Sequence, residues 1–369
     1  MNKYKNTNFL FRMITVCFAV LFSACESMMR YIEVEPADFQ PVLAVSSIIN
    51  TDGTFSVSFT EARSIGSYRN WRPEEETIIR SGEVTLYDET AGETVTRIQS
   101  DGFDMSLRQY YNREPYIRDS LHFEAGHTYR LTLDIEGYPT ATATATIPDA
   151  PIIEEVSLNL QQTLHFSNAY RISPFTPDAF QVHSIDCSPL NLRLTDNSPQ
   201  RDYYMSYMIR DIDSEAFSGL AYHDIAVSDR ALIQDNPDME AAQLLMDSEI
   251  DAFLFERLLF SDMSFANTAG TVKLLIDPGF LKQGGYYDKY PDPPCDNPPV
   301  HVTVYICVAH LSANSYAHYR SISLQRAGMD FFSEPVSIVS NIENGYGCFS
   351  AINTVRYKLA EYESCDLSY

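Results

Sequence analysis

The chain has 369 residues, with 26 Lys and Arg against 50 Asp and Glu, and a formal net charge of -24 at pH 7. A surface this acidic repels phosphate backbones and anionic headgroups, which argues against nucleic acid as a partner. Hydrophobic residues make up 45% of the sequence, enough for globular cores, and the length suggests two domains at roughly 150 residues each.

The first 24 residues have the layout of a secretory signal peptide. A basic head precedes an apolar run over residues 13–24, which is shorter than the ~20 residues that a membrane span requires. The run ends in the small residues Ser23 and Ala24, directly before Cys25, as in the signals of lipoproteins. We therefore predict cleavage after residue 24 and lipid attachment at Cys25. The alternative is an ordinary cleaved signal in which Cys25 is not acylated.

Residues 25–40 show no periodicity, and we expect them to form a tether. Over residues 41–148, short runs such as residues 55–59 and 129–135 alternate apolar with polar side chains. This period of two indicates antiparallel sheets with one face in water, and Gly-containing turns separate the runs. About seven short strands in this span predict an immunoglobulin-like β-sandwich.

Two prolines, Pro148 and Pro151, mark the clearest boundary in the chain, because proline cannot continue a central strand. A second, larger β-rich domain is predicted over residues 149–369. The alternating residues 203–209 and 302–308 form two of its strands, and Cys307 lies on the face opposite to the valines of the second. The sequence thus predicts a mainly β chain of two domains, the second carrying a few helices.

Two segments carry signals of a helix. Ser248 and Asp251 resemble a capping box, and apolar residues follow at helical spacing as far as Leu258. A second helix is predicted from about Asn314 to Ala327, with Gly328 as its stop. Both helices would pack on the strands of the second domain.

Five cysteines follow Cys25, and we consider them as possible disulfide cysteines: Cys187, Cys295, Cys307, Cys348 and Cys365. An exported chain permits disulfides, but an odd number leaves at least one thiol free, and the connectivity stays open. No pair has Cys-x-x-Cys spacing, which argues against zinc and thioredoxin-like chemistry. We predict no cofactor.

The sequence contains neither a Gly-x-Ser-x-Gly elbow nor a His-Glu-x-x-His pair. His122 and His127 flank a turn. Three others could gather in the second domain: His301, His310 and His318. Scattered histidines without motif spacing are more often hydrogen-bonded structural residues than ligands. We therefore predict that the protein is not an enzyme, although a triad assembled only in three dimensions stays open, because triads are recognised by geometry.

Two acidic segments have part of the spacing of a calcium loop. In the first, Ala216 and Tyr222 stand where such a loop needs Gly and Glu, and the spacing also fits carboxylates on the wet face of a strand. The second belongs to a Pro-rich loop over residues 284–299. We predict no metal at either segment, whose acidic and amide residues are Asp211, Asp213 and Glu215, and Asp292, Asp296 and Asn297.

Four aromatic residues lie in non-periodic stretches that we expect to be loops: Trp71, Tyr110, Tyr111 and Tyr116. Exposed aromatic rings supply flat apolar area with a polar tip, which suits contacts with sugars, peptides or proteins. They are therefore candidate ligand-binding residues. The alternative is that the loops fold back over the sandwich and bury them.

Three motifs of the second half occur in a distinctive order: Asp202-Tyr203-Tyr204, Phe260-Ser261-Asp262, and residues 341–349 (NIENGYGCF). Together they resemble the uncharacterised lipoprotein family named domain of unknown function 4249, in which the first motif usually begins with Asn. The resemblance covers essentially the whole mature chain. In the third motif, Gly345 and Gly347 suit a turn or bulge where the chain re-enters a sheet.

The resemblance implies an outer-membrane lipoprotein, often encoded beside TonB-dependent transporters, with no settled activity. We therefore expect a chain anchored by its N-terminal lipid on the periplasmic or cell-surface face of the outer membrane. There it would be a non-enzymatic binding or docking accessory of a TonB-dependent β-barrel. The alternatives are a cell-surface hydrolase that uses His301, His310 or His318, and a structural or adhesive surface protein.

Overall fold

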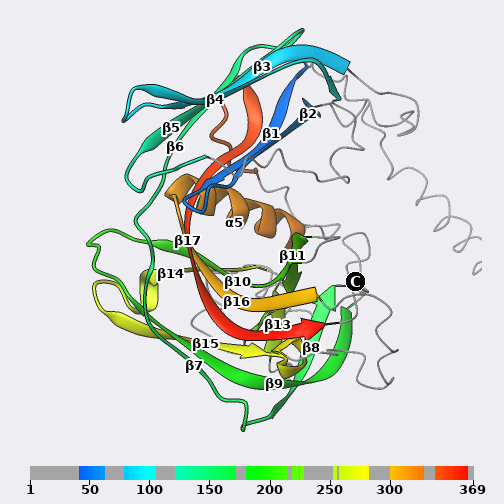
Figure 1. The fold of residues 1–369 in the computed structure, drawn as a ribbon, viewed down its shortest axis with the longest axis vertical. Helices are drawn as coiled ribbons and strands as arrows, with labels where there is room; N and C mark the ends of the chain where they lie inside the picture. Colours follow the sequence, from blue (N-terminus) through cyan, green and yellow to red (C-terminus); the bar gives the residue numbers. More distant parts are fainter. Residues whose placement is uncertain are drawn as a thin grey trace, which may run out of the picture. The chain divides into compact units, whose positions relative to one another are not determined.

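The structure is a computed structural model, and strands make up most of what it describes (Figure 1), so the predicted mainly β class is confirmed. The described residues are 41–62, 79–104, 121–171, 180–213, 218–223, 225–227, 252–255, 257–281, 300–327 and 337–364. Among them, none of the helices is both long enough and apolar enough to cross a bilayer.

The described strands form three sheets. The largest has the order β11 (Ser218–His223), β10 (Tyr203–Asp213), β16 (Val300–Leu311), β17 (Gly345–Ser364), β1 (Val42–Asn50) and β2 (Phe55–Ala62), with β14 (Leu258–Ser261) also paired to β10. The second has the order β15 (Ala269–Ile276), β12 (Ile225–Val227), β13 (Ala252–Phe255), β8 (Leu164–Arg171), β9 (Phe180–Thr195) and β7 (Ile152–Leu158), and β15 also pairs with β9. The third has the order β4 (Glu93–Asp104), β3 (Ile79–Asp88), β5 (Thr128–Ile135) and β6 (Ala141–Thr146).

The first hydrophobic core joins the third sheet to β1, β2 and the beginning of β17. The alternation read from the sequence decides which side chains enter it: Phe55, Val57 and Phe59 from β2 are buried, while the serines between them face away. On β5 the same period buries Tyr129 and Leu131. The predicted strands at residues 55–59 and 129–135 are thus confirmed.

A buried tyrosine fixes the beginning of β5. The hydroxyl of Tyr129 accepts a hydrogen bond from the backbone N–H of Glu124 at 2.9 Å, and its ring packs edge-on against Phe123. A tyrosine that bonds the backbone a few residues upstream resembles the tyrosine corner of immunoglobulin-like sandwiches. This feature supports the immunoglobulin-like topology, which stays a prediction.

Strand β17 connects segments that are distant in the sequence. Its first residues pair in parallel with β1, from Gly345 beside Leu43 to Ile352 beside Asn50. Its remaining residues pair antiparallel with β16, from Ile352 to Ser364. A single strand therefore joins β1, from the N-terminal part of the chain, to β16, from the C-terminal part. The domain division at residue 148 stays a prediction.

Strands β10 and β16 are buried on both faces. Tyr204 and Met208 enter a second core together with the leucines of β9, while Met205 and Tyr207 enter a third core that includes Tyr316 of α5 (Ala313–Ala327). The strands predicted at residues 203–209 and 302–308 are confirmed. The Cys307 side chain lies on the face of β16 opposite to Val304 and Val308, as predicted.

The helix predicted near residues 314–327 is confirmed as α5. The helix predicted from Ser248 to Leu258 is wrong in its described part, because residues 252–255 and 258–261 form β13 and β14. All four residues of β14 are buried against β10, and a segment that is apolar on every side fits an internal strand as well as a helix. The short 3-10 helices η2 (Asp262–Ser264) and η3 (Pro278–Leu281) complete the described elements.

Candidate functional site

The residues predicted to carry the lipid or to bind a ligand lie outside the described residues. They are Cys25, Trp71, Tyr110, Tyr111 and Tyr116, and with them Cys295, Cys365 and the acidic residues of the Pro-rich loop. Their roles stay predictions. The candidate sites that the structure can describe are therefore built from strands and their connections.

Three of the possible disulfide cysteines are free and buried thiols in the structure: Cys187, Cys307 and Cys348. Burial raises the pKa of the Cys187 and Cys307 thiols to about 12 and that of the Cys348 thiol to about 11. A thiol of such high pKa in apolar surroundings stays protonated and inert, so these three cysteines act as packing residues.

The histidines considered for a hydrolase do not gather. His301 and His310 lie at opposite ends of β16, about 30 Å apart at the rise of a strand. The Nδ1 atom of His310 lies 2.8 Å from the carbonyl oxygen of Asp149, and that of His318 lies 2.6 Å from the carbonyl oxygen of Val339. These two imidazoles therefore hold neighbouring backbone in place.

His301 is the imidazole nearest to a triad-like arrangement. Its Nε2 atom lies 3.4 Å from the Thr303 hydroxyl, and its Nδ1 atom lies 3.0 Å from a carboxylate oxygen of Glu363. The same Nε2 atom, however, lies nearer to Glu361, at 3.1 Å. The ring is thus occupied by two carboxylates on a half-exposed strand surface and does not activate the threonine.

The first acidic segment considered for calcium lies in a hairpin. Asp211 pairs with Leu220 and Asp213 with Ser218 in the ladder between β10 and β11, so both residues continue a strand. Glu215 lies outside the described residues. Within the part of the chain that the structure describes, no three His, Cys, Asp or Glu side chains form a group that could hold a metal ion.

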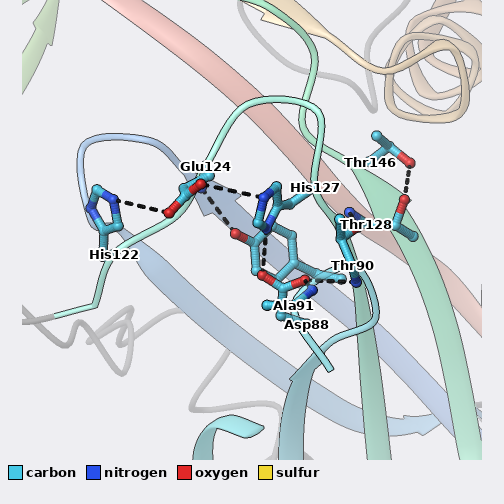
Figure 2. A network of polar contacts seen from close by, with 9 residues as sticks. Asp88, Thr90, Ala91, His122, Glu124, His127, Thr128 and Thr146 are labelled. Atoms are coloured by element: carbon cyan, nitrogen blue, oxygen red, sulfur yellow. Dashed lines mark hydrogen bonds and ion pairs between the residues drawn. The ribbon is translucent and has the colours of Figure 1, made fainter. Parts of the chain in front are cut away.

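A polar network around His127 connects the turn after β3 to the segment before β5 (Figure 2). The Nδ1 atom of His127 lies 2.8 Å from Asp88, and its Nε2 atom lies 3.3 Å from Glu124, which in turn lies 3.7 Å from His122. The other Asp88 oxygen accepts the backbone N–H groups of Thr90 and Ala91. We call Asp88, His122, Glu124 and His127 the histidine network.

Asp88 is charged and fully partnered in this network. Burial by itself would raise the pKa of its carboxyl group, but the hydrogen bonds from His127 and from the two backbone N–H groups outweigh burial and lower it. The hydrogen bond to Asp88 raises the pKa of His127 in return. The histidine network is therefore an ion pair that stabilises a turn.

The second polar group is an acidic cluster of Asp196, Asp202 and Asp262, brought together by two of the sequence motifs. Tyr203 pairs with Ser261, and beyond them the N–H of Asp262 donates to the carbonyl oxygen of Asp202 at 3.1 Å. Asp196 follows the end of β9 and is joined to Asn267 through its carboxylate. Three carboxyl groups from three separate segments thus meet beside Tyr204.

The ring of Tyr204 forms the apolar wall of the acidic cluster. It stacks on Phe260 and Phe265 with centroid distances of 5.5 and 6.2 Å, and it lies 5.1 Å from the ring of His310. The Nε2 atom of His310 lies 3.5 Å from an Asp202 oxygen. His310 therefore lies at the Asp202 side of this cluster.

The carboxyl groups of the acidic cluster are poorly compensated. Burial raises the pKa of Asp202, His310 opposes the rise, and Asp196 and Asp262 add to it. Burial also raises the pKa of Asp262, and Asp196 adds to that rise. The backbone of Asp202 and the charge of Arg201 oppose this rise, although neither oxygen of Asp262 has a hydrogen-bond partner.

A shallow polar shelf of about 340 Å³ lies on the outer face of three adjacent strands, β7, β9 and β15. Its side chains form two rows across the strands, Glu155 beside Arg193 beside Thr271, and Ser157 beside Asn191 beside Lys273. Because strand side chains alternate, the same strands place Leu192 and Val272 in the core on the opposite face. The shelf offers hydrogen-bonding groups and both charges, but little apolar area.

The motif at residues 341–349 connects two sheets. The side chain of Asn341 bonds both backbone groups of Phe349, at 2.9 Å each, as a neighbouring strand would. Glu343 exchanges two backbone hydrogen bonds with Thr142 on β6, at 2.7 and 3.2 Å. At Gly347, φ is +106° and a Cβ atom would overlap the Val45 carbonyl oxygen, so the predicted need for glycine is confirmed.

A family model described as domain of unknown function (DUF4249) matches residues 30–358. The chain belongs to this family. A comparison with curated proteins found no match. The DUF4249 match includes the histidine network, the acidic cluster and the motif at residues 341–349. The residues of this motif have a structural role, because they join β17 to β1 and to β6.

Proposed function

We propose that this protein is an outer-membrane lipoprotein, anchored through Cys25, that is a non-enzymatic binding or docking accessory of a TonB-dependent transporter. The observation that carries the proposal is the N-terminal sequence, in which a basic head, an apolar run over residues 13–24 and two small residues lead directly to Cys25. Membership of DUF4249 supports it.

The described geometry supports a binding role over a catalytic one. Each histidine considered for a hydrolase contacts a carboxylate or a backbone carbonyl group, as in residues that hold structure. The polar shelf on β7, β9 and β15 offers an open surface for hydrogen bonding, and such a surface suits a docked loop or a polar ligand.

The tether restricts where a partner can be. Residues 25–40 link the lipid to β1, and sixteen residues span at most roughly 55 Å when fully extended. The folded strands are therefore held close to the membrane surface, where the loops of an outer-membrane barrel are within reach. The net charge of -24 keeps the protein away from anionic headgroups, which leaves the lipid as the membrane contact.

Lipid attachment is tested by mass spectrometry of the processed chain and by cell fractionation. We expect an acylated Cys25 as the first residue of the mature chain, and loss of both acylation and membrane association in Cys25→Ala. Cys17→Ala, which changes a cysteine within the leader, is the matched control and should leave both unchanged. An unmodified N-terminus, or a retained leader, would refute the anchor.

The partner is tested by affinity purification of the processed chain from detergent-solubilised native membranes after crosslinking. We expect a TonB-dependent barrel to be recovered in stoichiometric amount with wild type and to be lost with Cys25→Ala. If repeated purifications recover the acylated protein without a barrel, the anchor stands and the transporter role is wrong.

A further inference from the structure

The carboxyl group of Asp262 is the most anomalous polar group in the described part of the chain. The residue is 1% exposed, and neither of its carboxyl oxygens has a hydrogen-bond partner. A buried carboxylate without a donor is strongly unfavourable, so such a group either takes up a proton or has a cation beside it. The side chains around Asp262 decide between these two.

Several titratable or charged groups face the acidic cluster. Asp196 follows β9, Arg201 and Asp202 precede β10, Tyr204 lies on β10, and His310 lies on β16. Asp262 itself follows β14. Three carboxyl groups of like charge therefore share one buried space, and such groups cannot all ionise at little cost.

The three carboxyl groups differ in the donors they already have. Asp196 accepts the backbone N–H of Ser198 at 2.8 Å with one oxygen and that of Asn267 at 2.6 Å with the other. Asp202 has the ring of His310 beside it, at 3.5 Å. Neither carboxyl oxygen of Asp262 has a hydrogen-bond partner. The Asp202 backbone and the charge of Arg201 lower the pKa of Asp262, whereas the neighbouring carboxyl group of Asp196 raises it.

We propose that Asp262 is protonated at neutral pH and donates this proton in a hydrogen bond to the carboxylate of Asp196. The proton comes from water and binds one Oδ atom of Asp262, and the same proton returns to water when the pair opens. The pair fastens the connection between β9 and β10 to the beginning of η2. We call this hydrogen bond between Asp262 and Asp196 the clasp; it depends on the proton and connects two loops.

A proton fits this place better than a cation. The described His, Cys, Asp and Glu side chains do not provide a group of three with the arrangement of a metal site. Each oxygen of Asp196 already accepts one backbone N–H group. A remaining lone pair is enough to accept one proton from Asp262, whereas a cation needs several further oxygen ligands. A single hydrogen bond between two carboxyl groups needs no further ligands.

The first experiment looks for the proton directly, in the processed full chain in detergent. Infrared spectra with ¹³C-labelled aspartate should show the C=O band of a protonated, buried carboxylic acid at about pH 7. The band should disappear in Asp262→Asn and persist in Asp101→Asn, a control at an exposed aspartate on β4. A spectrum without the band, or one in which Asp262→Asn leaves it unchanged, overturns the proposal.

The second experiment measures urea unfolding against pH. Because the folded-state pKa is raised above the ordinary value of 3.8, the folded state binds the extra proton and loses stability as pH rises towards its raised pKa. Asn cannot ionise, so Asp262→Asn should escape this loss. We expect its folding equilibrium constant, relative to wild type, to rise by up to about tenfold per pH unit in that window.

The second experiment also excludes a cation. If calcium raises the unfolding midpoint of wild type, a chelator reverses the rise and Asp262→Asn abolishes it, the missing partner is a cation and the clasp is wrong. If Asp262→Asn does not fold, a wild-type spectrum without the band still overturns the proposal, and Asp196→Asn, which removes the carboxylate that accepts the proton, replaces Asp262→Asn: the band should shift in Asp196→Asn, and an unshifted band overturns the proposal.

Discussion

Asp88 and Asp262 are two buried aspartates at strand ends that reach stability by opposite means. Asp88 is 5% exposed and Asp262 is 1% exposed, so both have left water. Asp88 has three donors, one of which is a histidine that takes up a proton, whereas the oxygens of Asp262 have no partner among the described groups. A buried carboxyl group is thus stable either as a charge with donors or as a neutral acid.

The difference sets the sign of their pH dependence. The pKa of Asp88 is lowered, so its contribution is present above the ordinary value of 3.8 and is lost as pH falls through the folded pKa. The pKa of Asp262 is raised, so its folded form is favoured at low pH and loses stability as pH rises. Acid therefore weakens one cluster and strengthens the other.

Among the substitutions that test the contrast between Asp88 and Asp262, Asp88→Ala should lower the free energy of unfolding most. It leaves His127 and the backbone N–H groups of Thr90 and Ala91 without their acceptor, at a cost of about 3 kcal/mol in the free energy of unfolding. Urea unfolding at neutral pH measures it. A loss as small as that of Asp101→Asn, an exposed control, would show that the turn does not depend on Asp88.

Asp202→Asn should relieve the acidic cluster, whereas Asp88→Ala disrupts the histidine network. The charge of Asp262 raises the pKa of Asp202, and this repulsion is mutual. Asp202→Asn removes the like charge and keeps the shape of the side chain, so the pKa of Asp262 should move down towards its ordinary value. We expect a smaller change than for Asp88→Ala and a weaker loss of stability with rising pH. An unchanged pH profile would mean that the carboxyl group of Asp202 does not influence Asp262.

His127→Gln should sharpen the comparison through its pH profile. The raised pKa of His127 means that its contribution is fully present below the unfolded value of 6.5 and is lost as pH rises through the folded pKa. The difference in unfolding midpoint between wild type and variant should therefore be greatest near about pH 5 and shrink by about pH 8. A pH-independent difference would show that the ring acts by packing alone.

His122→Ala should have the smallest effect. The side chain is 83% exposed and lies 3.7 Å from Glu124, and an exposed pair of this kind contributes little. We expect an unfolding midpoint equal to that of wild type within the error of the measurement. A clear loss would extend the histidine network beyond Asp88, Glu124 and His127.

Local sequence patterns predicted those features of the fold that do not depend on contacts with distant segments. The alternation in Phe55, Val57 and Phe59 predicts which face of β2 is buried, because side chains on a strand alternate by geometry. The helix α5 was predicted with nearly its observed bounds, with Gly328 as its stop. The helical spacing read before Leu258 misled the same procedure, since residues 252–255 and 258–261 form strands, and a short apolar run such as β14, buried at all four residues, fits a strand as well as a helix.

The candidate sites depend on pairings that no local pattern contains. Asp202 and Asp262 stand out in the sequence only within their motifs, and the ladder between β10 and β14 brings them together with Asp196. The pairing of Asp88 with His127 likewise depends on the register of β3 against β5. A carboxyl group acquires its donors, or lacks them, from segments far away in the chain.

The sequence by itself determined the strand-rich class, the acidic surface, the family and the glycine at position 347, because each follows from composition, period or local backbone geometry. The tertiary structure alone decided that β17 pairs with both β1 and β16, and that Asp88 is partnered while Asp262 is not. The physical reason is that burial and strand register are properties of contacts between distant segments, and these contacts set the charge of a buried group.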